Sequence, residues 1–320
     1  MKSAIVPGSI AVWIVLACAG PAHAQYPVRP LRLIVPFAAG SVNDLVARVL
    51  APPMSEALGQ PIVIDNRAGA AGNLGAEIAA QAPSDGYTLV MGNASHAISM
   101  SLYGRLNYDF VKDFAPVSRL AAGAFLLAVH PSVPAKSVKE LIALAKSRPD
   151  ELNVGVGGAS IVMAAELFKS TAGIRMTSVS YKGTPAILTA LAGGEVTIAF
   201  PPTSAAMPMA RSGKVRALAV TGKRRSTMAP EIATVAEAGL PGYEAATWYA
   251  LLTRAGTPPK VVARLNAEAV RALARPEVRK RFAATDLATE SSTPQELGKY
   301  MRSEVAKWAK VVKAAGLRVN

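Results

Sequence analysis

Short apolar runs alternate with amphipathic segments along most of this chain. The runs at residues 31–35 and 61–65 are each followed by a turn of small residues and then by apolar positions at helical spacing. The same order of strand, turn and helix is expected from residues 87–91 and again from residues 153–156. Because strands that alternate with helices usually pair in parallel, this pattern predicts the α/β fold class.

The middle of the chain is expected to form a second lobe that is inserted into the first. Strands at residues 115–120 and 124–129 lead into a crossover, and a strand at residues 248–252 is expected to rejoin the first lobe. The predicted division is 25–125 plus 246–320 for lobe 1 and 126–245 for lobe 2. Ligands of such folds bind beyond the carboxyl ends of the strands, so we expect a central cleft.

Local signals place several further elements. Ser137 is expected to cap a helix, with Glu140 at the capping-box position. Residues 92–96 are expected to form a polar loop. The chain beyond Pro258 is predicted to be helical, with helices at residues 259–274, 276–284 and 294–315.

The N-terminus has the pattern of a secretory signal peptide. Met1-Lys2 precedes an apolar run at residues 10–17, and Ala22-His23-Ala24 forms a small-x-small cleavage site. We expect residues 1–24 to be removed by cleavage after Ala24 and the mature chain to be exported. The alternative is that Cys18 is lipidated, but Leu16 stands where a lipoprotein motif prefers a small residue.

The net charge and the small number of cysteine and histidine residues exclude several classes of protein. The net charge is +14 and falls to +13 without Lys2, yet the basic residues are scattered. The one local cluster, at residues 223–225, lacks interleaved aromatic residues, so no nucleic-acid partner is expected. A general positive field instead favours anionic solutes. Without Cys18 the mature chain has no thiol and only His96 and His130, so we expect no metal and no cofactor.

The segment at residues 66–76 is a candidate binding turn. It contains three glycines and four alanines, so its backbone N–H groups can approach a ligand closely, and Asn73 is expected to cap the helix that follows. Residues 36–44 repeat this design, and residues 92–96 form a third such turn. Helix N-termini attract carboxylates and phosphates, although small residues in such turns also serve tight packing. His96 is either a ligand contact or a structural histidine that bonds to the backbone.

Motifs distributed over the whole mature length carry a resemblance to a known family. They are Tyr26-Pro27 with Arg29-Pro30, Ile34-Val35-Pro36-Phe37, residues 66–76, Asp85-Gly86-Tyr87-Thr88-Leu89, Lys112-Asp113-Phe114-Ala115-Pro116-Val117, Tyr181-Lys182-Gly183, Ala217-Leu218-Ala219-Val220-Thr221, and residues 230–239. In these motifs the chain resembles the periplasmic substrate-binding proteins of tripartite tricarboxylate transporters, the Bug family. The resemblance implies a type II Venus-flytrap receptor that captures a small carboxylate by backbone N–H groups and ordered waters and then docks on a membrane permease. We expect it to be a monomer.

The resemblance and the turns together give a set of candidate ligand-binding residues. They are Phe37, Gly40, Ser41, Asn43, Asp44, Gly69, Ala70, Gly72, Asn73, Gly92, Asn93, Ser95 and His96 in lobe 1, and Ala159, Ser160, Tyr181, Lys182, Gly183 and Thr203 in lobe 2. Besides His96, three of these have open alternatives. Asp44 either orients a water or an amine, or complements a helix N-terminus. Lys182 is a counter-ion or a solvated turn lysine, and Tyr181 is a contact or a packing residue.

Three departures from the family pattern concern the ligand. Residues 40–44 replace a Gly-Gly-Gly-Thr-Asp run, Val162 stands where histidine is common, and Pro201-Pro202 replaces Asp-Asn. Each change replaces a polar contact with apolar surface. We therefore expect a ligand more apolar than citrate, such as an aromatic or branched monocarboxylate.

An enzyme is the competing hypothesis, either nucleotide-dependent or hydrolytic and acting on carboxylate derivatives. Residues 69–75 read G-x-x-G-x-x-G rather than G-x-G-x-x-G, and no acidic residue ends the strand at residues 89–91. A hydrolase would need a nucleophile elbow, and residues 158–162 lack its second glycine. The motifs thus favour a binding protein over a catalyst.

Overall fold

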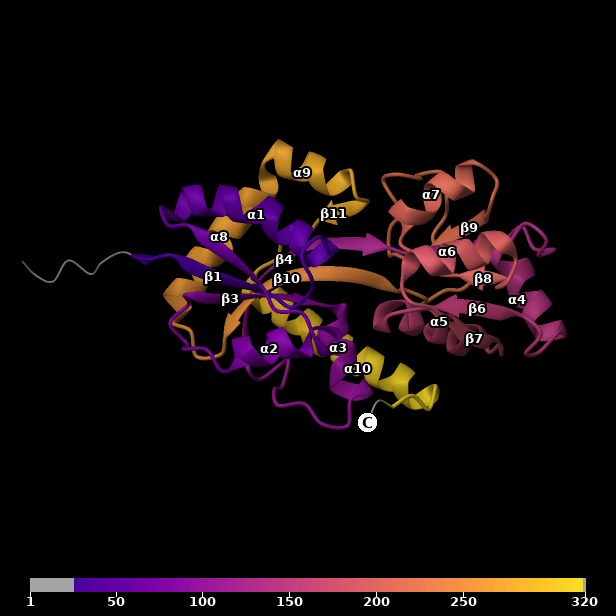
Figure 1. The fold of residues 1–320 in the computed structure, drawn as a ribbon, viewed down its shortest axis with the longest axis horizontal. Coiled ribbons are helices and arrows are strands. Elements are labelled where there is room, and N and C mark those ends of the chain that lie inside the picture. The colour runs from indigo at the N-terminus through magenta and orange to yellow at the C-terminus, as the bar shows by residue number, and fades with distance from the viewer. Residues whose placement is uncertain (1–25, 319–320) are drawn as a thin grey trace, which may run out of the picture.

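Two β-sheets, each flanked by helices, form two lobes in the computed structural model, which describes residues 26–318 (Figure 1). The strands of the first sheet are β1 (Leu31–Val35), β2 (Ile62–Asn66), β3 (Thr88–Asn93), β4 (Phe114–Ala124), β10 (Ala246–Arg254) and β11 (Leu287–Thr289). They lie in the order β11-β4-β10-β3-β1-β2. The strands of the second sheet are β5 (Leu126–Val129), β6 (Asn153–Val156), β7 (Thr177–Ser180), β8 (Ile198–Ala199) and β9 (Arg216–Val220). Their order is β7-β6-β8-β5-β9.

The helices follow the predicted alternation with the strands. Those of the first lobe are α1 (Val42–Leu58), a short 3-10 turn η1 (Ala70–Gly72), α2 (Asn73–Ala80), α3 (Ala94–Leu102), α8 (Pro259–Ala274), α9 (Pro276–Ala283) and α10 (Pro294–Ala314). Those of the second lobe are α4 (Val138–Ser147), α5 (Ala159–Ala172), α6 (Thr184–Gly193) and α7 (Thr203–Arg211). Within residues 26–318, no helix has the length and apolar character needed to cross a membrane.

Apolar residues on both faces of the first sheet determine its parallel core. In the register, Leu33 of β1 lies opposite Ile64 of β2 on one side and Leu89 of β3 on the other. Leu33 and Ile34 are both buried, although they point to opposite faces of β1. This arrangement directs the carboxyl ends of β1, β2 and β3 toward the second lobe, where the candidate turns begin.

Two strand connections join the lobes. β4 of the first sheet continues through Phe125 into β5 of the second, and the chain returns from β9 to β10. The amide of Phe125 donates to the hydroxyl of Thr221 at 2.8 Å, which ties the two connections together. We call β4, β10 and these connections the hinge strands.

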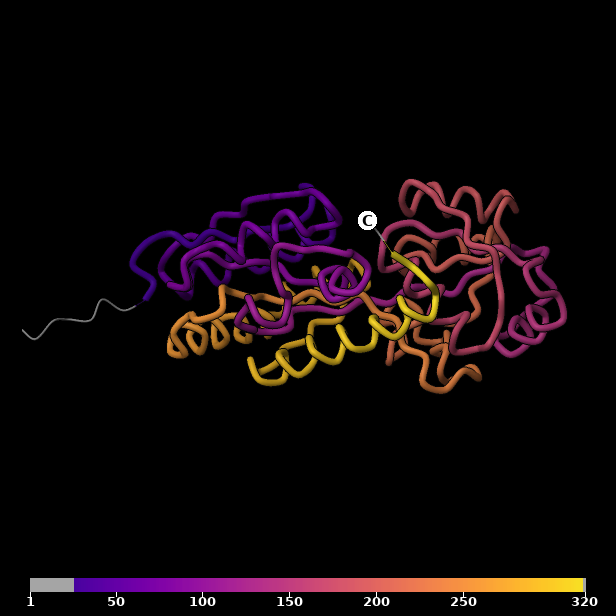
Figure 2. Tube along the Cα trace, turned by 90° about the horizontal axis from the view of Figure 1, so that it is seen from below, coloured from indigo at the N-terminus to yellow at the C-terminus, as the bar shows by residue number. Residues whose placement is uncertain are grey.

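The C-terminal helix α10 contacts both lobes. It packs on α3 and β4 of the first lobe and reaches α5 of the second, so it runs along one side of the molecule in Figure 2. Glu304 on α10 accepts hydrogen bonds from the indole groups of Trp248 at 2.9 Å and Trp308 at 3.0 Å. Trp308 is buried in the core.

The structure corrects three predictions about local elements. Residues 92–96 are not a loop, because β3 runs to Asn93 and α3 begins at Ala94, with the Asn93 side chain accepting from the Ser95 amide. Asn73 does not cap α2: Gly72 is the N-cap, and the Asn73 oxygen accepts from the Tyr108 hydroxyl at 2.7 Å. The C-terminal part is not wholly helical, because β11 pairs with β4.

The capping prediction for α4 is confirmed in part. The Ser137 hydroxyl accepts a hydrogen bond from the Glu140 amide, as predicted. The Glu140 carboxylate does not return to Ser137 and accepts instead from the amide of Lys136 at 2.7 Å. The predicted signal peptide, residues 1–24 with Cys18, lies outside the described residues.

Candidate functional site

A cavity of about 340 Å³ lies between the lobes and gathers the turns that follow several strands of both sheets. We call it the cleft cavity. Its lining residues are Phe37, Val42, Ala71, Ser95, Gly123, Ala124, Phe125, Gly157, Gly158, Ala159, Ser160, Ile161, Pro202, Ser204, Thr247, Tyr249, Thr285, Asp286 and Leu287. The first lobe contributes the turns after β1, β2 and β3, and the second lobe those after β6 and β8. This is the position at which α/β folds bind ligands.

The start of α5 presents a group of uncapped backbone donors at this cavity. Gly158 precedes the helix at a φ of 74°, and no side chain among the described residues caps the first turn. A Cβ on Gly158 would meet nothing within 4 Å, whereas one on Gly157 would lie 2.7 Å from the Tyr181 carbonyl oxygen. Gly157 thus allows a close backbone approach, and Gly158 leaves open space in front of the free N–H groups. A helix of 14 residues with such a start is suited to an anion.

Phe37 forms the facing wall in the first lobe. A Cβ on Gly72 would lie 2.8 Å from the Phe37 ring, so the glycine lets the ring pack directly on the backbone of the β2–α2 turn. The ring of Phe37 meets His96 edge-on, with centroids 6.2 Å apart. His96 in turn stacks on Phe110 at 5.4 Å. The aromatic group makes this wall apolar and rigid.

His96 lies behind Phe37 and bonds to the backbone. Its Nδ1 accepts from the Asn93 amide at 3.1 Å, so a neutral ring carries its proton on Nε2, which is buried and has no hydrogen-bond partner among the described residues. Burial lowers the pKa of His96 to about 4. The ring is therefore neutral near pH 7.

Asp44 holds the β1–α1 turn together. Its Oδ2 accepts from the Gly40 amide at 2.9 Å and from Arg48 Nε at 2.8 Å, and its Oδ1 accepts from Asn66 Nδ2 at 3.0 Å. Burial acts to raise the pKa of this carboxyl, but these hydrogen bonds outweigh burial and hold the pKa below its usual value. The contacts support the structural alternative for Asp44, which does not line the cleft cavity.

The cleft cavity brings together four of the predicted site residues: Phe37, Ser95, Ala159 and Ser160. Its lining does not include Gly40, Ser41, Asn43, Asp44, Gly69, Ala70, Gly72, Asn73, Gly92, Asn93, His96, Tyr181, Lys182, Gly183 or Thr203. Many of these support the lining from behind. The Ser41 hydroxyl caps α1, and the side-chain amide of Asn93 donates to the side-chain oxygen of Asn43 at 3.0 Å. The Thr203 hydroxyl donates to the Ala124 carbonyl at 3.0 Å.

The β7–α6 turn stands apart from the cleft cavity. Tyr181 is half-buried, while Lys182 and Gly183 are exposed. The Tyr181 carbonyl lies against Gly157, so this turn supports the start of α5 from outside. These positions favour packing for Tyr181 and a solvated turn for Lys182.

Sequence reasoning missed the residues that the hinge strands contribute. Residues 123 and 124 end β4, and Phe125 lies in the connection to β5. Thr247 and Tyr249 lie on one face of β10. Residues 285 and 286 precede β11, which begins at Leu287. The alternation of Thr247, Trp248 and Tyr249 along a strand was the available signal, because it places the first and third on the same face. The turn before β11 carried no motif.

Comparisons with known proteins agree with this geometry. The tripartite tricarboxylate transporter family receptor (TctC) matches residues 46–317. Protein BugT of Bordetella pertussis is 35% identical over 299 residues, which cover 92% of either chain. An R. palustris protein solved with adipate is 37% identical at a TM-score of 0.77, covering 92% of this chain and 99% of that one. MatC from Rhodopseudomonas palustris, solved with bound malate, is 34% identical at a TM-score of 0.73, and the match covers 90% of this chain and 100% of that one.

Two lobes around a cleft of helix N-termini define a periplasmic solute-binding protein of the type II Venus-flytrap class. This chain belongs to the tripartite tricarboxylate transporter receptor family, to which the Bug proteins belong. The predicted fold class and family are confirmed. Because the family consists of receptors, the prediction of a solute receptor is confirmed and the enzyme hypothesis is not supported.

Proposed function

We propose that this receptor captures a small carboxylate with an apolar body in the cleft cavity and delivers it to a cognate membrane permease. The observation that carries the proposal is the uncapped start of α5, which opens into a cavity shared by both lobes. Its free N–H groups and the helix dipole would hold a carboxylate without a full countercharge. Relatives solved with adipate and malate support the same chemical class.

The remaining lining argues for an apolar ligand body. Phe37, Val42, Phe125, Ile161, Pro202 and Leu287 surround the cavity, and an apolar group buried among them is stabilised by roughly 25 cal/mol for each Å² removed from water. An aromatic or branched monocarboxylate matches this surface better than citrate, whose three carboxylates would lose hydration there.

Closure of the lobes around the ligand follows from the hinge strands. We take 25–125 plus 246–320 as lobe 1 and 126–245 as lobe 2, in line with the assignment of β4 and β10 to one sheet and β5 and β9 to the other. A ligand that touches both lobes binds the closed form better and so shifts the population toward it. The residues that support the turns, such as Asp44, Gly72 and Asn93, would keep the lining in place during closure. We further propose export with cleavage after Ala24 and a monomeric receptor.

Titration of residues 25–320 with matched acids and amides tests this function. We expect phenylacetate and isovalerate to raise the melting temperature, because a ligand that binds only the folded state stabilises it. The corresponding primary amides, which keep the shape without the charge, should have no effect, and citrate should bind more weakly. Tight citrate binding with none for the monocarboxylates would contradict the apolar ligand class. If no organic acid shifted the melting temperature, the receptor function itself would lose its support.

A further inference from the structure

Asp286 presents a buried carboxylate oxygen without a hydrogen-bond partner. The residue is 8% exposed and precedes β11 at the edge of the first sheet. Its Oδ1 accepts from the Ser226 hydroxyl at 2.5 Å, while its Oδ2 is buried and unpartnered among the described residues. A buried carboxylate oxygen without a donor is costly, so the free oxygen calls for an explanation.

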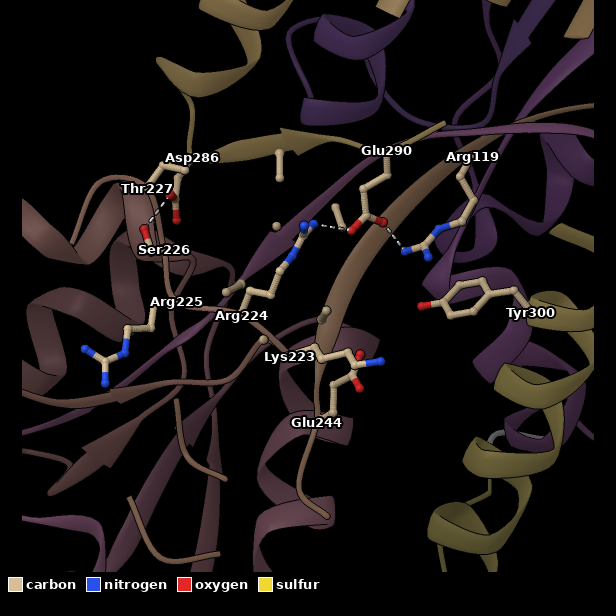
Figure 3. Close-up of a pocket in the computed structure, with 16 residues that line it drawn as sticks. Arg119, Lys223, Arg224, Arg225, Ser226, Thr227, Glu244, Asp286, Glu290 and Tyr300 are labelled. Carbon is tan, nitrogen blue, oxygen red and sulfur yellow. Dashed lines mark hydrogen bonds and ion pairs between the residues drawn. The ribbon is translucent and has the colours of Figure 1, made fainter. Parts of the chain in front are cut away.

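Asp286 borders the cleft cavity and also a second cavity. A second cavity of about 390 Å³, which we call the rear cavity, has Arg119, Arg224, Glu290 and Tyr300 in its lining. The two cavities lie on opposite faces of β10, because Thr247 and Tyr249 line the cleft cavity while Ala246 lines the rear one. Asp286 lines both cavities. Figure 3 shows it at the border of the rear cavity, facing Ser226.

The backbone conformation of Asp286 and a hydrogen bond to its carboxylate both fix the position of its side chain. Its backbone has a φ of 57°, in the left-handed region that aspartate and asparagine tolerate better than most residues. The Ser226 oxygen accepts from the Met228 amide at 3.0 Å, so its own hydrogen is directed to Asp286. Ser226 follows β9 of the second sheet, and this hydrogen bond therefore crosses between the lobes. With Oδ1 engaged in this way, Oδ2 is the carboxylate oxygen that accepts from no group among the described residues.

The nearby arginines of the rear cavity form ion pairs with two other acids, Glu290 and Glu237. Glu290 pairs through Oε1 with Arg224 Nη2 at 3.1 Å and through Oε2 with Arg119 Nη2 (Figure 3). Arg225 pairs with Glu237 at 3.0 Å. Among the described residues, no cation forms an ion pair with Asp286.

We propose that Asp286 is a specificity-determining residue, which accepts a hydrogen bond from an ammonium group at the far end of the bound carboxylate ligand. The inference rests on the proposed function, because the start of α5 holds the ligand's anionic end. The ligand class is then an acid with a separated amine rather than a dicarboxylate. A second carboxylate at that end would face the Asp286 carboxylate, and like charges at close range repel.

Three six-carbon acids with different far ends test this inference by calorimetry. The probes are 6-aminohexanoate, hexanoate and adipate, whose far ends are positive, neutral and negative. We expect the wild type to bind 6-aminohexanoate best and adipate least. Asp286→Asn keeps the shape of the side chain, and asparagine tolerates the same backbone conformation, so the variant should fold. We expect it to bind 6-aminohexanoate about tenfold or more weakly than the wild type and to bind adipate more tightly.

Glu290→Gln is the matched control. It removes one negative charge close to the hinge but lines only the rear cavity, so the order of the three acids should not change. The inference is overturned if the wild type does not prefer 6-aminohexanoate, or if Asp286→Asn changes the affinity for all three acids by the same factor. In either case binding of other carboxylates would leave the proposed function intact. Failure of every acid in both experiments would instead contradict the proposed function.

Discussion

Polar side chains behind the cleft cavity form hydrogen bonds with other residues of the chain. Asp44 accepts from Gly40, Arg48 and Asn66, and Asn66 also donates to the Phe37 carbonyl at 3.1 Å. These bonds fix the β1–α1 turn and with it the wall that Phe37 provides. These polar residues thus shape the site from behind its lining.

His96 makes the stability of the protein depend on pH. The pKa of His96 is about 4 in the folded protein and about 6.5 in an unfolded chain, because burial disfavours the charged ring. Between these values only the unfolded chain takes up the proton. The contribution of His96 is therefore complete above pH 6.5 and is lost as the pH falls toward 4, by an amount on the order of 3 kcal/mol.

Urea unfolding of the wild type and of His96→Asn at pH 7 and pH 4 measures this contribution. The asparagine keeps an acceptor for the Asn93 amide but cannot titrate. We expect the variant to be less stable at pH 7, since it loses the stacking on Phe110. Between pH 7 and pH 4, its free energy of unfolding should fall by about 3 kcal/mol less than that of the wild type. An equal loss in both proteins would show that His96 does not cause the pH dependence.

At the scale of elements, we expect the start of α5 to be the part of the cavity that distinguishes charge. Ser160 lies in its first turn and lines the cleft cavity. An acidic residue in the first turn of a helix is favourable for the helix, since it complements the dipole. The same charge would repel a carboxylate ligand.

We therefore expect Ser160→Asp to abolish binding of phenylacetate while the melting temperature of the free protein stays equal or rises slightly. Ser160→Asn, with nearly the same shape and no charge, should bind within a few-fold of the wild type. Calorimetry on both variants, with a thermal scan of each, provides the measurement. Unchanged affinity in Ser160→Asp would place the carboxylate elsewhere.

The order of elements was largely predictable from the sequence, but the composition of the site was not. Strand, turn and helix follow from local periodicity, so β1 with α1 and β6 with α5 lie where the pattern places them. The cleft cavity depends on contacts between distant segments. Thr247 and Asp286 reach it only because β10 and β11 pair with β4, a register that no local signal gives. Asn73 was assigned to a cap by its residue type, yet the hydroxyl of Tyr108 engages it.

On the scale of the whole molecule, the lobes meet at the hinge strands, at contacts between α3 and α5, and along α10. The cleft cavity and the rear cavity lie on opposite faces of β10, with Asp286 and Ser226 joining the lobes between them. Rotation about the hinge strands would therefore change both cavities together. This geometry gives the receptor a way to enclose a ligand without rearranging either sheet.

The helix α6 offers an internal comparison for the anion site. Like α5 it begins after a glycine, and no described side chain caps it. Its start lies on the exposed β7–α6 turn, outside the cleft cavity. The two helices thus have similar local structure but a different relation to the other lobe.

The most direct test is an NMR titration of the backbone amides of the mature chain with phenylacetate. We predict saturable downfield shifts of the amide protons of Ala159, Ser160 and Ile161, because a carboxylate would accept hydrogen bonds from them, and much smaller changes at Thr184 and Ala186 of α6. Binding that saturates while the amides at the start of α5 keep their positions would contradict the claim that this helix holds the carboxylate.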